Sequence, residues 1–147
     1  MASIKDRVLI VDCNTSQPKQ HRIFNVPLDA YDSERSVDEQ TDWHYAIQQT
    51  HISNLDLLSI SRLTPNPIDF LRLPRLHIFF EQLRERYTLM LLDAPPILPT
   101  ADSLALSNHA DAFVLVVDLN RTTRDVLHSA CDRISHTQIP ILGFIEI

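Results

Sequence analysis

The chain has 147 residues, 44% of them hydrophobic and 22% charged, with a formal net charge of −6. This length and balance predict one globular domain over residues 1–147, and the negative charge argues against a nucleic-acid partner, which favours a basic face. Cys13 and Cys131 are far apart in the sequence, which indicates neither a disulfide framework nor a zinc site. The apolar runs have the length of strands and the start "MASIKDRVLIVD" carries charges, so we expect a cytoplasmic protein without a membrane span.

Apolar runs predict five β-strands along the chain. They are rich in Val, Ile and Leu and mostly lack polar alternation, which is typical of strands covered on both faces. In chain order the expected strands cover residues 7–12, 55–60, 88–93, 112–118 and 139–147.

Helical patterns lie between these strands. A weak pattern covers residues 42–49, a strong one covers residues 74–87 with Pro74 in the first turn, and a short one covers residues 102–108. In the last pattern, residues 122–137, Thr122 is the expected N-cap, with Asp125 three positions later. The apolar stripes of the two longer patterns consist of Leu76, Phe79, Phe80, Leu83 and Tyr87, and of Leu127, Ala130, Cys131 and Ile134.

Alternating strands and helices predict the fold class, a three-layer α/β fold with a mostly parallel sheet. Between the first two expected strands, residues 29–42 are acidic and poor in apolar side chains. We interpret this segment as an exposed acidic loop. Its charged residues are Asp29, Asp32, Glu34, Arg35, Asp38, Glu39 and Asp42.

Three of the apolar runs end on aspartate, at Asp12, Asp93 and Asp118. Ligands of parallel α/β sheets bind at the carboxyl ends of the strands, and Mg²⁺ takes one or two carboxylates together with water and phosphate oxygens. The acids are therefore candidate Mg²⁺ ligands. The alternative is that each aspartate caps the turn that follows it. If Asp12 and Asp93 face each other without a metal, their repulsion is expected to raise one pKa.

Two further groups of polar residues are weaker candidates for a binding site. Arg121 and Arg124, which follow the strand ending at Asp118, lie where they could reach an anion, although surface charge at a helix start explains them equally well. His128 and Cys131 share a helix face, but two ligands without a third are a weak indication of zinc.

Three segments carry a family resemblance. The segment "VLIVDCNTSQPKQHRIFN" is similar to the second nucleotide motif, Walker A′, of the bacterial tyrosine kinases (BY-kinases) of capsule and exopolysaccharide synthesis. The segments "LTPNPIDFLRLPR" and "LMLLDAPP" resemble that family's Pro-Asn-Pro segment and its Walker B strand, and "RTTRDVLHSACDRISHTQIPILGF" resembles its late helix and last core strand. The resemblance covers nearly the whole chain, in the family's order.

The resemblance implies a fold of the deviant P-loop ATPase type, related to partitioning and cell-division-site ATPases. It implies that Asp12 and Asp93 are the catalytic and Mg²⁺-holding acids, Asp93 being the Walker B carboxylate. It places Asn14, where the family has a second Walker A′ acid, and Pro95, in the loop that presents Asp93, beside the nucleotide. Phosphoryl transfer in such proteins depends on positioning and charge neutralisation.

The chain departs from the family pattern where the phosphates are held. Gly143 is its single glycine, and G-x-x-x-x-G-K-[ST] does not occur in the 147 residues, so we expect the fold to lack the P-loop strand and the first helix. Ser16 and Gln17 replace a basic pair, Ile147 stands where relatives have a base-reading asparagine, and no tyrosine cluster follows. Four missing charge-assisted hydrogen bonds correspond to about 6 kcal/mol, or roughly 10⁴-fold in affinity. Mg²⁺ and ATP are expected to bind only if a P-loop segment completes the fold.

Loss of a central strand leaves backbone groups without partners, which predicts self-association or dependence on another chain. The resemblance suggests a membrane protein of polysaccharide chain-length control or export as that partner, which would hold a cytoplasmic domain at the inner face of the membrane. Three functions remain open: a degenerate kinase-like scaffold without ATP binding, an enzyme part that a P-loop-bearing polypeptide completes, and an α/β domain that binds Mg²⁺ without nucleotide.

Overall fold

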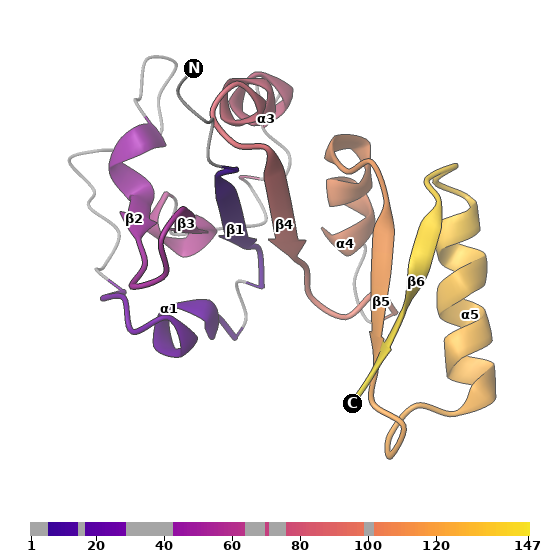
Figure 1. Ribbon diagram of the computed structural model, residues 1–147. Coiled ribbons are helices and arrows are strands. Elements are labelled where there is room, and N and C mark those ends of the chain that lie inside the picture. The colour runs from indigo at the N-terminus through magenta and orange to yellow at the C-terminus, as the bar shows by residue number, and fades with distance from the viewer. Residues whose placement is uncertain (1–5, 15–16, 29–42, 64–69, 71–75, 99–101) are drawn as a thin grey trace. The chain divides into compact units, whose positions relative to one another are not determined.

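The computed structural model (Figure 1) describes residues 6–14, 17–28, 43–63, 70, 76–98 and 102–147. The expected acidic loop at residues 29–42 and Pro74 lie outside this set. The chain divides into two compact units, Met1–Pro95 and Pro96–Ile147. Each unit is α/β, which agrees with the fold class expected from the sequence, whereas the single domain over residues 1–147 stays a prediction.

The first unit is built on a four-stranded sheet in the order β2-β3-β1-β4. Strands β1 (Val8–Asp12), β3 (Leu55–Ser59) and β4 (Leu89–Asp93) run parallel, with β1 between the other two. The short β2 (Ile47–Gln49) pairs antiparallel with β3 at one edge, and β4 forms the other edge. Three of the predicted strands are thus confirmed, and their carboxyl ends lie at the same end of the sheet.

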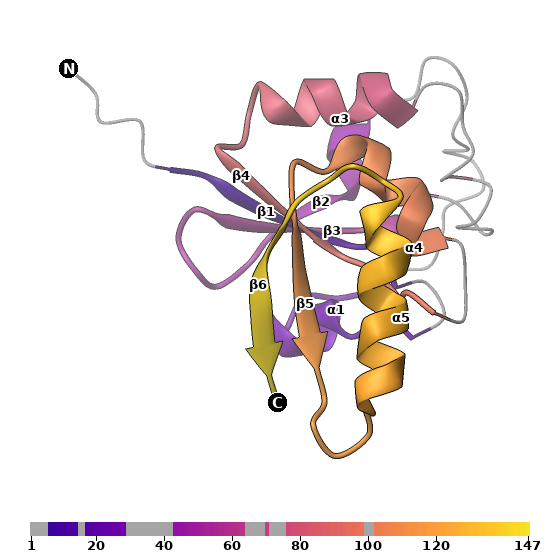
Figure 2. The same cartoon turned by 90° about the vertical axis from the view of Figure 1, so that its right-hand side faces the viewer.

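An aromatic cluster anchors the helix α3 (Leu76–Arg84), which Figure 2 shows lying along one side of these strands. The predicted stripe is confirmed because Leu76, Phe79, Phe80, Leu83 and Tyr87 are all buried. The ring of Phe79 lies 4.9 Å from that of Trp43, 5.5 Å from that of Phe70 and 5.3 Å from that of Phe80, measured between centroids. Phe79 is therefore the centre of this part of the core.

Two local predictions in the first unit were wrong or incomplete. The helix expected at residues 42–49 is a 3-10 turn, η2 (Trp43–Ala46), followed by β2, because Ala46 and Trp43 pack inward while the next residues pair with β3. The sequence reading also missed the one-turn helix α1 (Gln20–Ile23) and the 3-10 turn η3 (Ile60–Arg62). Short turns of this kind have too few residues to show a period.

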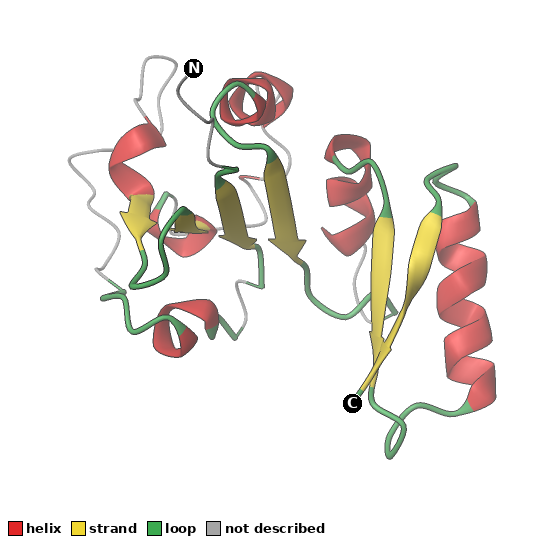
Figure 3. Ribbon diagram, viewed as in Figure 1, coloured by secondary structure: helices red, strands yellow, loops and turns green. Residues whose placement is uncertain are grey.

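The second unit is a βαβ unit preceded by a short helical segment (Figure 3). Helix α4 (Asp102–Ala105) continues into η4 (Leu106–His109), as predicted for this region. Strand β5 (Phe113–Val117) pairs parallel with β6 (Ile141–Glu146), and helix α5 (Arg124–Ser135) connects them. The cap of α5 is Thr123 and not Thr122, since the Thr123 hydroxyl accepts a hydrogen bond from the Val126 N–H at 3.4 Å.

The strands were expected to be covered on both faces, and three of them are not. Leu89 and Leu91 of β4 are 51% and 50% exposed, and Val116 of β5 is 62% exposed. In β5 and β6 exposed and half-buried residues largely alternate, which is the pattern of a sheet with one covered face. The prediction that these strands are covered on both faces was therefore wrong, because each unit covers only part of its sheet. Among the described residues, no helix has the length and apolarity to cross a membrane.

Phe79→Ala is expected to lower the free energy of unfolding by about 3–5 kcal/mol, because it removes a ring that touches three others. Urea denaturation followed by circular dichroism measures the change. The matched control is Ile78→Ala on the same helix, where the side chain is 44% exposed and the expected change is within about 0.5 kcal/mol. Equal effects of the two substitutions would contradict this description of the core.

Candidate functional site

Three polar side chains form a row across the carboxyl ends of the parallel strands. The register pairs Asp12 of β1 with Ser59 of β3 on one side and with Asp93 of β4 on the other. Residues paired in this way project on the same face of a sheet. Asp12 is 2% exposed and Ser59 is fully buried. The structure thus brings together two of the three acids that the sequence singled out and adds a serine that it did not.

Gln20 at the start of α1 contacts both acids of this row. Its backbone N–H donates to Asp12 Oδ2 at 3.2 Å, and its side-chain Nε2 donates to Asp93 Oδ2 at 2.6 Å. The second oxygen of Asp12 accepts from the Asn14 N–H at 3.2 Å. The backbone of the strand ends is joined as well, because the Cys13 N–H donates to the Asp93 carbonyl at 3.0 Å.

Burial dominates the electrostatics of Asp12. The pKa of its carboxyl is raised above the ordinary 3.8, chiefly because burial disfavours the charged form, while the hydrogen bond from the Gln20 N–H opposes the rise and the charge of Asp93 adds to it. The expected repulsion between the two acids is therefore present but is a smaller cause than burial. Burial also raises the pKa of the Cys13 thiol, with Asp12 and Asp93 adding to the effect, so Cys13 is a neutral core residue.

Asn14 and Pro95, the two residues expected beside the nucleotide, lie close in sequence to the two acids. Asn14 follows the first acid directly, and its side-chain oxygen accepts from the Gln17 N–H at 3.3 Å. Pro95 is the last residue of the first unit, two positions after Asp93. The roles of Asn14 and Pro95 in nucleotide binding stay predictions.

Three of the remaining candidates in the second unit have local partners: Asp118, Arg121 and His128. Asp118 organises the turn after β5: its Oδ1 accepts from the Asn120 N–H at 2.9 Å and its Oδ2 lies 3.5 Å from Arg121 Nε. On α5, His128 Nδ1 lies 3.1 Å from Asp132 Oδ2. Within the described part of the chain, no group of three His, Cys, Asp or Glu side chains has the arrangement to hold a metal ion. For Asp118 the turn-capping alternative therefore accounts for what the structure describes.

The row of Asp12, Asp93 and Ser59 has the chemistry that a hard cation requires. The polar side-chain atoms of these three residues are all oxygens. Two carboxylates are enough for Mg²⁺, which retains water and substrate oxygens. Ser59 Oγ is buried and finds no hydrogen-bond partner among the described residues, although buried hydroxyls are normally satisfied. The residues present therefore fit a divalent cation at this row.

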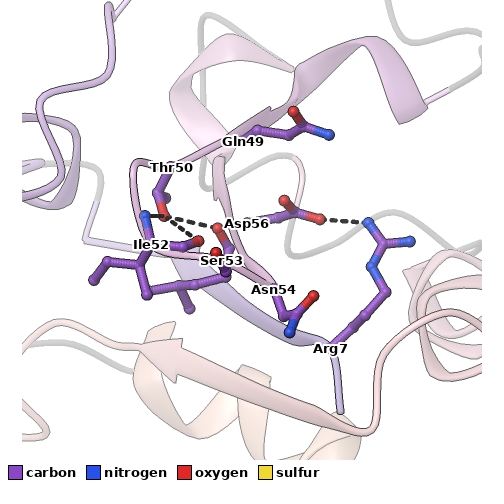
Figure 4. Close-up of a pocket in the computed structure, with 8 residues that line it drawn as sticks. Arg7, Gln49, Thr50, Ile52, Ser53, Asn54 and Asp56 are labelled. Atoms are coloured by element: carbon purple, nitrogen blue, oxygen red, sulfur yellow. Dashed lines mark hydrogen bonds and ion pairs between the residues drawn. The ribbon is translucent and has the colours of Figure 1, made fainter. Parts of the chain in front are cut away.

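A second polar network, at the amino ends of the strands, was missed by the sequence reading. Arg7 Nη2 lies 2.7 Å from Asp56 Oδ2, the Tyr87 hydroxyl donates to the same oxygen at 2.8 Å, and the guanidinium carbon lies 5.1 Å from the Tyr87 ring centroid. Burial and the bond to Asp56 raise the pKa of Tyr87 to about 12. Arg7 and Asp56 border a pocket of about 540 Å³ beside the β2–β3 hairpin (Figure 4). The sequence signal that could have indicated this network is Asp56, an acid within the largely apolar segment "LDLLSI".

Known proteins with similar sequences are tyrosine kinases. No family model matches the chain. It is 24% identical to the putative tyrosine-protein kinase CapB of Staphylococcus aureus, over 95% of this chain and 60% of CapB. It is 28% identical to the tyrosine-protein kinase YwqD of Bacillus subtilis strain 168, over 95% of this chain and 58% of YwqD. The chain thus spans about three fifths of the length of these relatives.

Solved structures agree on the fold. The chimerical protein CapA2B2 superposes with a TM-score of 0.82 at 25% identity, over 95% of this chain and 61% of that one. The septum site-determining protein MinD of Pyrococcus horikoshii, solved with Mg-ADP, superposes with a TM-score of 0.68 at 17% identity, over 95% and 57%, and shows the fold alone. The fold is that of bacterial tyrosine kinase domains and of related P-loop ATPases. The homologues of this chain are bacterial tyrosine-protein kinases.

Asp93→Asn is expected to lower the pKa of Asp12 toward 3.8, because it removes a charge that raises this pKa. Carboxyl-carbon NMR titration of the folded protein measures the shift. Glu81→Gln, an exposed change on α3, serves as the control and is expected to leave the Asp12 titration unchanged. An unaltered Asp12 pKa in Asp93→Asn would mean that the two carboxyls are apart.

The raised pKa of Asp12 in the unaltered protein also makes the stability of the fold depend on pH. Because the folded-state pKa of Asp12 is raised, the folded protein binds more protons than the unfolded chain between pH 3.8 and that raised value. The contribution of Asp12 to the free energy of unfolding therefore falls as pH rises through this window.

Proposed function

We propose that residues 1–147 form a degenerate kinase-like domain that acts as a cytoplasmic scaffold or regulatory module in capsule or exopolysaccharide synthesis and export, without binding ATP on its own. The homologous tyrosine kinases support the setting. The observation that carries the proposal is the combination of a paired acid row with a sequence that offers a single glycine and no G-x-x-x-x-G-K-[ST] in its 147 residues. Acids alone repel a triphosphate, and amide and ammonium donors are needed to hold it.

The exposed apolar strands support an interaction role. Leu89 and Leu91 lie on an edge strand, and edge strands offer unpaired backbone groups to another chain. The partner we propose is a second copy of the chain or a membrane protein of polysaccharide chain-length control or export. The membrane would then be reached through that partner.

A second function is favoured by one specific observation, the in-register pairing of Asp12 with Asp93. We propose as the alternative that the chain supplies these acids to an ATP-dependent protein-tyrosine kinase whose phosphate-binding loop comes from another segment. In that arrangement Asp12 and Asp93 hold Mg²⁺, which supplies positive charge to the phosphates. Autophosphorylation recovered on mixing the chain with a P-loop-bearing segment of a homologous kinase, and lost with Asp93→Asn, would favour this function over the scaffold.

Calorimetric titration of the chain with Mg·ATP tests the scaffold proposal. No saturable binding is expected at millimolar nucleotide. The chain lacks the hydrogen-bond donors that hold the phosphates, and their loss lowers the affinity roughly 10⁴-fold. YwqD titrated under the same conditions is the reference. Binding of Mg·ATP with a micromolar Kd would overturn the proposal.

A further inference from the structure

We infer that the side chain of Gln20 is a built-in competitor for a divalent cation at Asp12 and Asp93, so that cation binding requires this side chain to leave. The inference rests on the second proposed function, in which Asp12 and Asp93 hold Mg²⁺. It goes beyond that function because it assigns the control of the cation site to Gln20, which the sequence analysis did not single out.

The argument starts from the contacts of Gln20. A carboxylate only accepts hydrogen bonds, so the group that faces Asp93 Oδ2 at 2.6 Å is the amide –NH₂ of Gln20. The backbone N–H of the same residue reaches Asp12 Oδ2 at 3.2 Å. One neutral residue thus donates a hydrogen bond to each of the two carboxylates that would hold a shared cation.

A neutral amide compensates these charges incompletely. The register places the carboxylates of Asp12 and Asp93 on neighbouring strands, and Asp12 is almost fully buried. A divalent cation interacts with both carboxylates more strongly than a dipole does. The row therefore favours a cation over the amide wherever the cation concentration is sufficient, while the amide keeps the acids hydrogen-bonded in its absence.

The surroundings allow Gln20 to move. Helix α1 is four residues long, none of its residues is buried, and Lys19 at its N-cap makes no side-chain capping bond. A rotation of the Gln20 side chain would therefore not open the aromatic core around Phe79. The register of the strands fixes the positions of Asp12, Asp93 and Ser59, so these residues stay in place when the Gln20 side chain rotates.

The first test uses the unaltered chain and Mg²⁺ without nucleotide. The NMR signals of the Gln20 side-chain amide are expected to move toward those of a solvent-exposed amide as Mg²⁺ is added. The internal control is the side-chain amide of Gln48, which donates to the Pro27 carbonyl at 2.9 Å in the same unit and is expected to stay unchanged. If Mg²⁺ binds while the Gln20 amide signals remain in place, the inference fails.

The second test compares Mn²⁺ affinities of variants by calorimetry, again without nucleotide. Gln20→Met keeps the length of the side chain and removes the donor, so Mn²⁺ is expected to bind about tenfold more tightly than to the unaltered chain. The matched control is Gln17→Met, because Gln17 is exposed and contacts Asn14 through its backbone N–H. Thermal unfolding of each variant without metal verifies that it is folded.

The outcomes separate the inference from the proposals on which it rests. Equal or weaker binding in Gln20→Met, with binding lost in Asp93→Asn, overturns the role of Gln20 and leaves the cation site standing. Binding that persists in Asp93→Asn, or no binding of Mn²⁺ by any variant at millimolar concentration, overturns the cation site together with the inference. Neither result bears on the scaffold proposal, which the Mg·ATP titration tests separately.

Discussion

The parallel pairing of β1 with β3 and β4 is the constraint on which the candidate site depends. Because β1 lies between the other two strands in matched register, the residues that end the three strands form one row. The apolar residues before them contribute to the core, and this packing fixes the position of the row. Asp12 is therefore held in a buried position by the packing of Leu9 and Val11 along the same strand.

The same pairing explains why Gln20 matters. Two carboxylates on neighbouring strands need a donor or a cation between them, since burial makes the charged form of Asp12 costly. The chain places α1 over this end of the sheet, and one residue then satisfies both acids. The hydrogen bonds from Gln20 thus keep the two acids together without a metal, which is compatible with both proposed functions.

Much of the fold was predictable from the sequence because long apolar runs and helical stripes report burial directly. The strands ending at Asp12 and Asp93 and the stripe around Phe79 are examples, and the acids at strand ends followed from the rule for parallel sheets. Gln20 and Ser59 were not predictable, because a glutamine in a one-turn helix and a serine at the end of a strand have no periodic signal. The exposure of Leu91 was missed because sequence reports how apolar a strand is and not what covers it.

The network of Arg7, Asp56 and Tyr87 limits how the first sheet can assemble. Asp56 lies within β3, between residues that project to the opposite face, and it finds both partners only in the observed alignment. Sliding β3 by one position would turn this carboxylate to the other side of the sheet, away from the arginine and the phenol, and leave it buried and unpaired. The network thus acts against misaligned strands during folding, and it thereby secures the position of Ser59 beside Asp12 from the far end of the same strand.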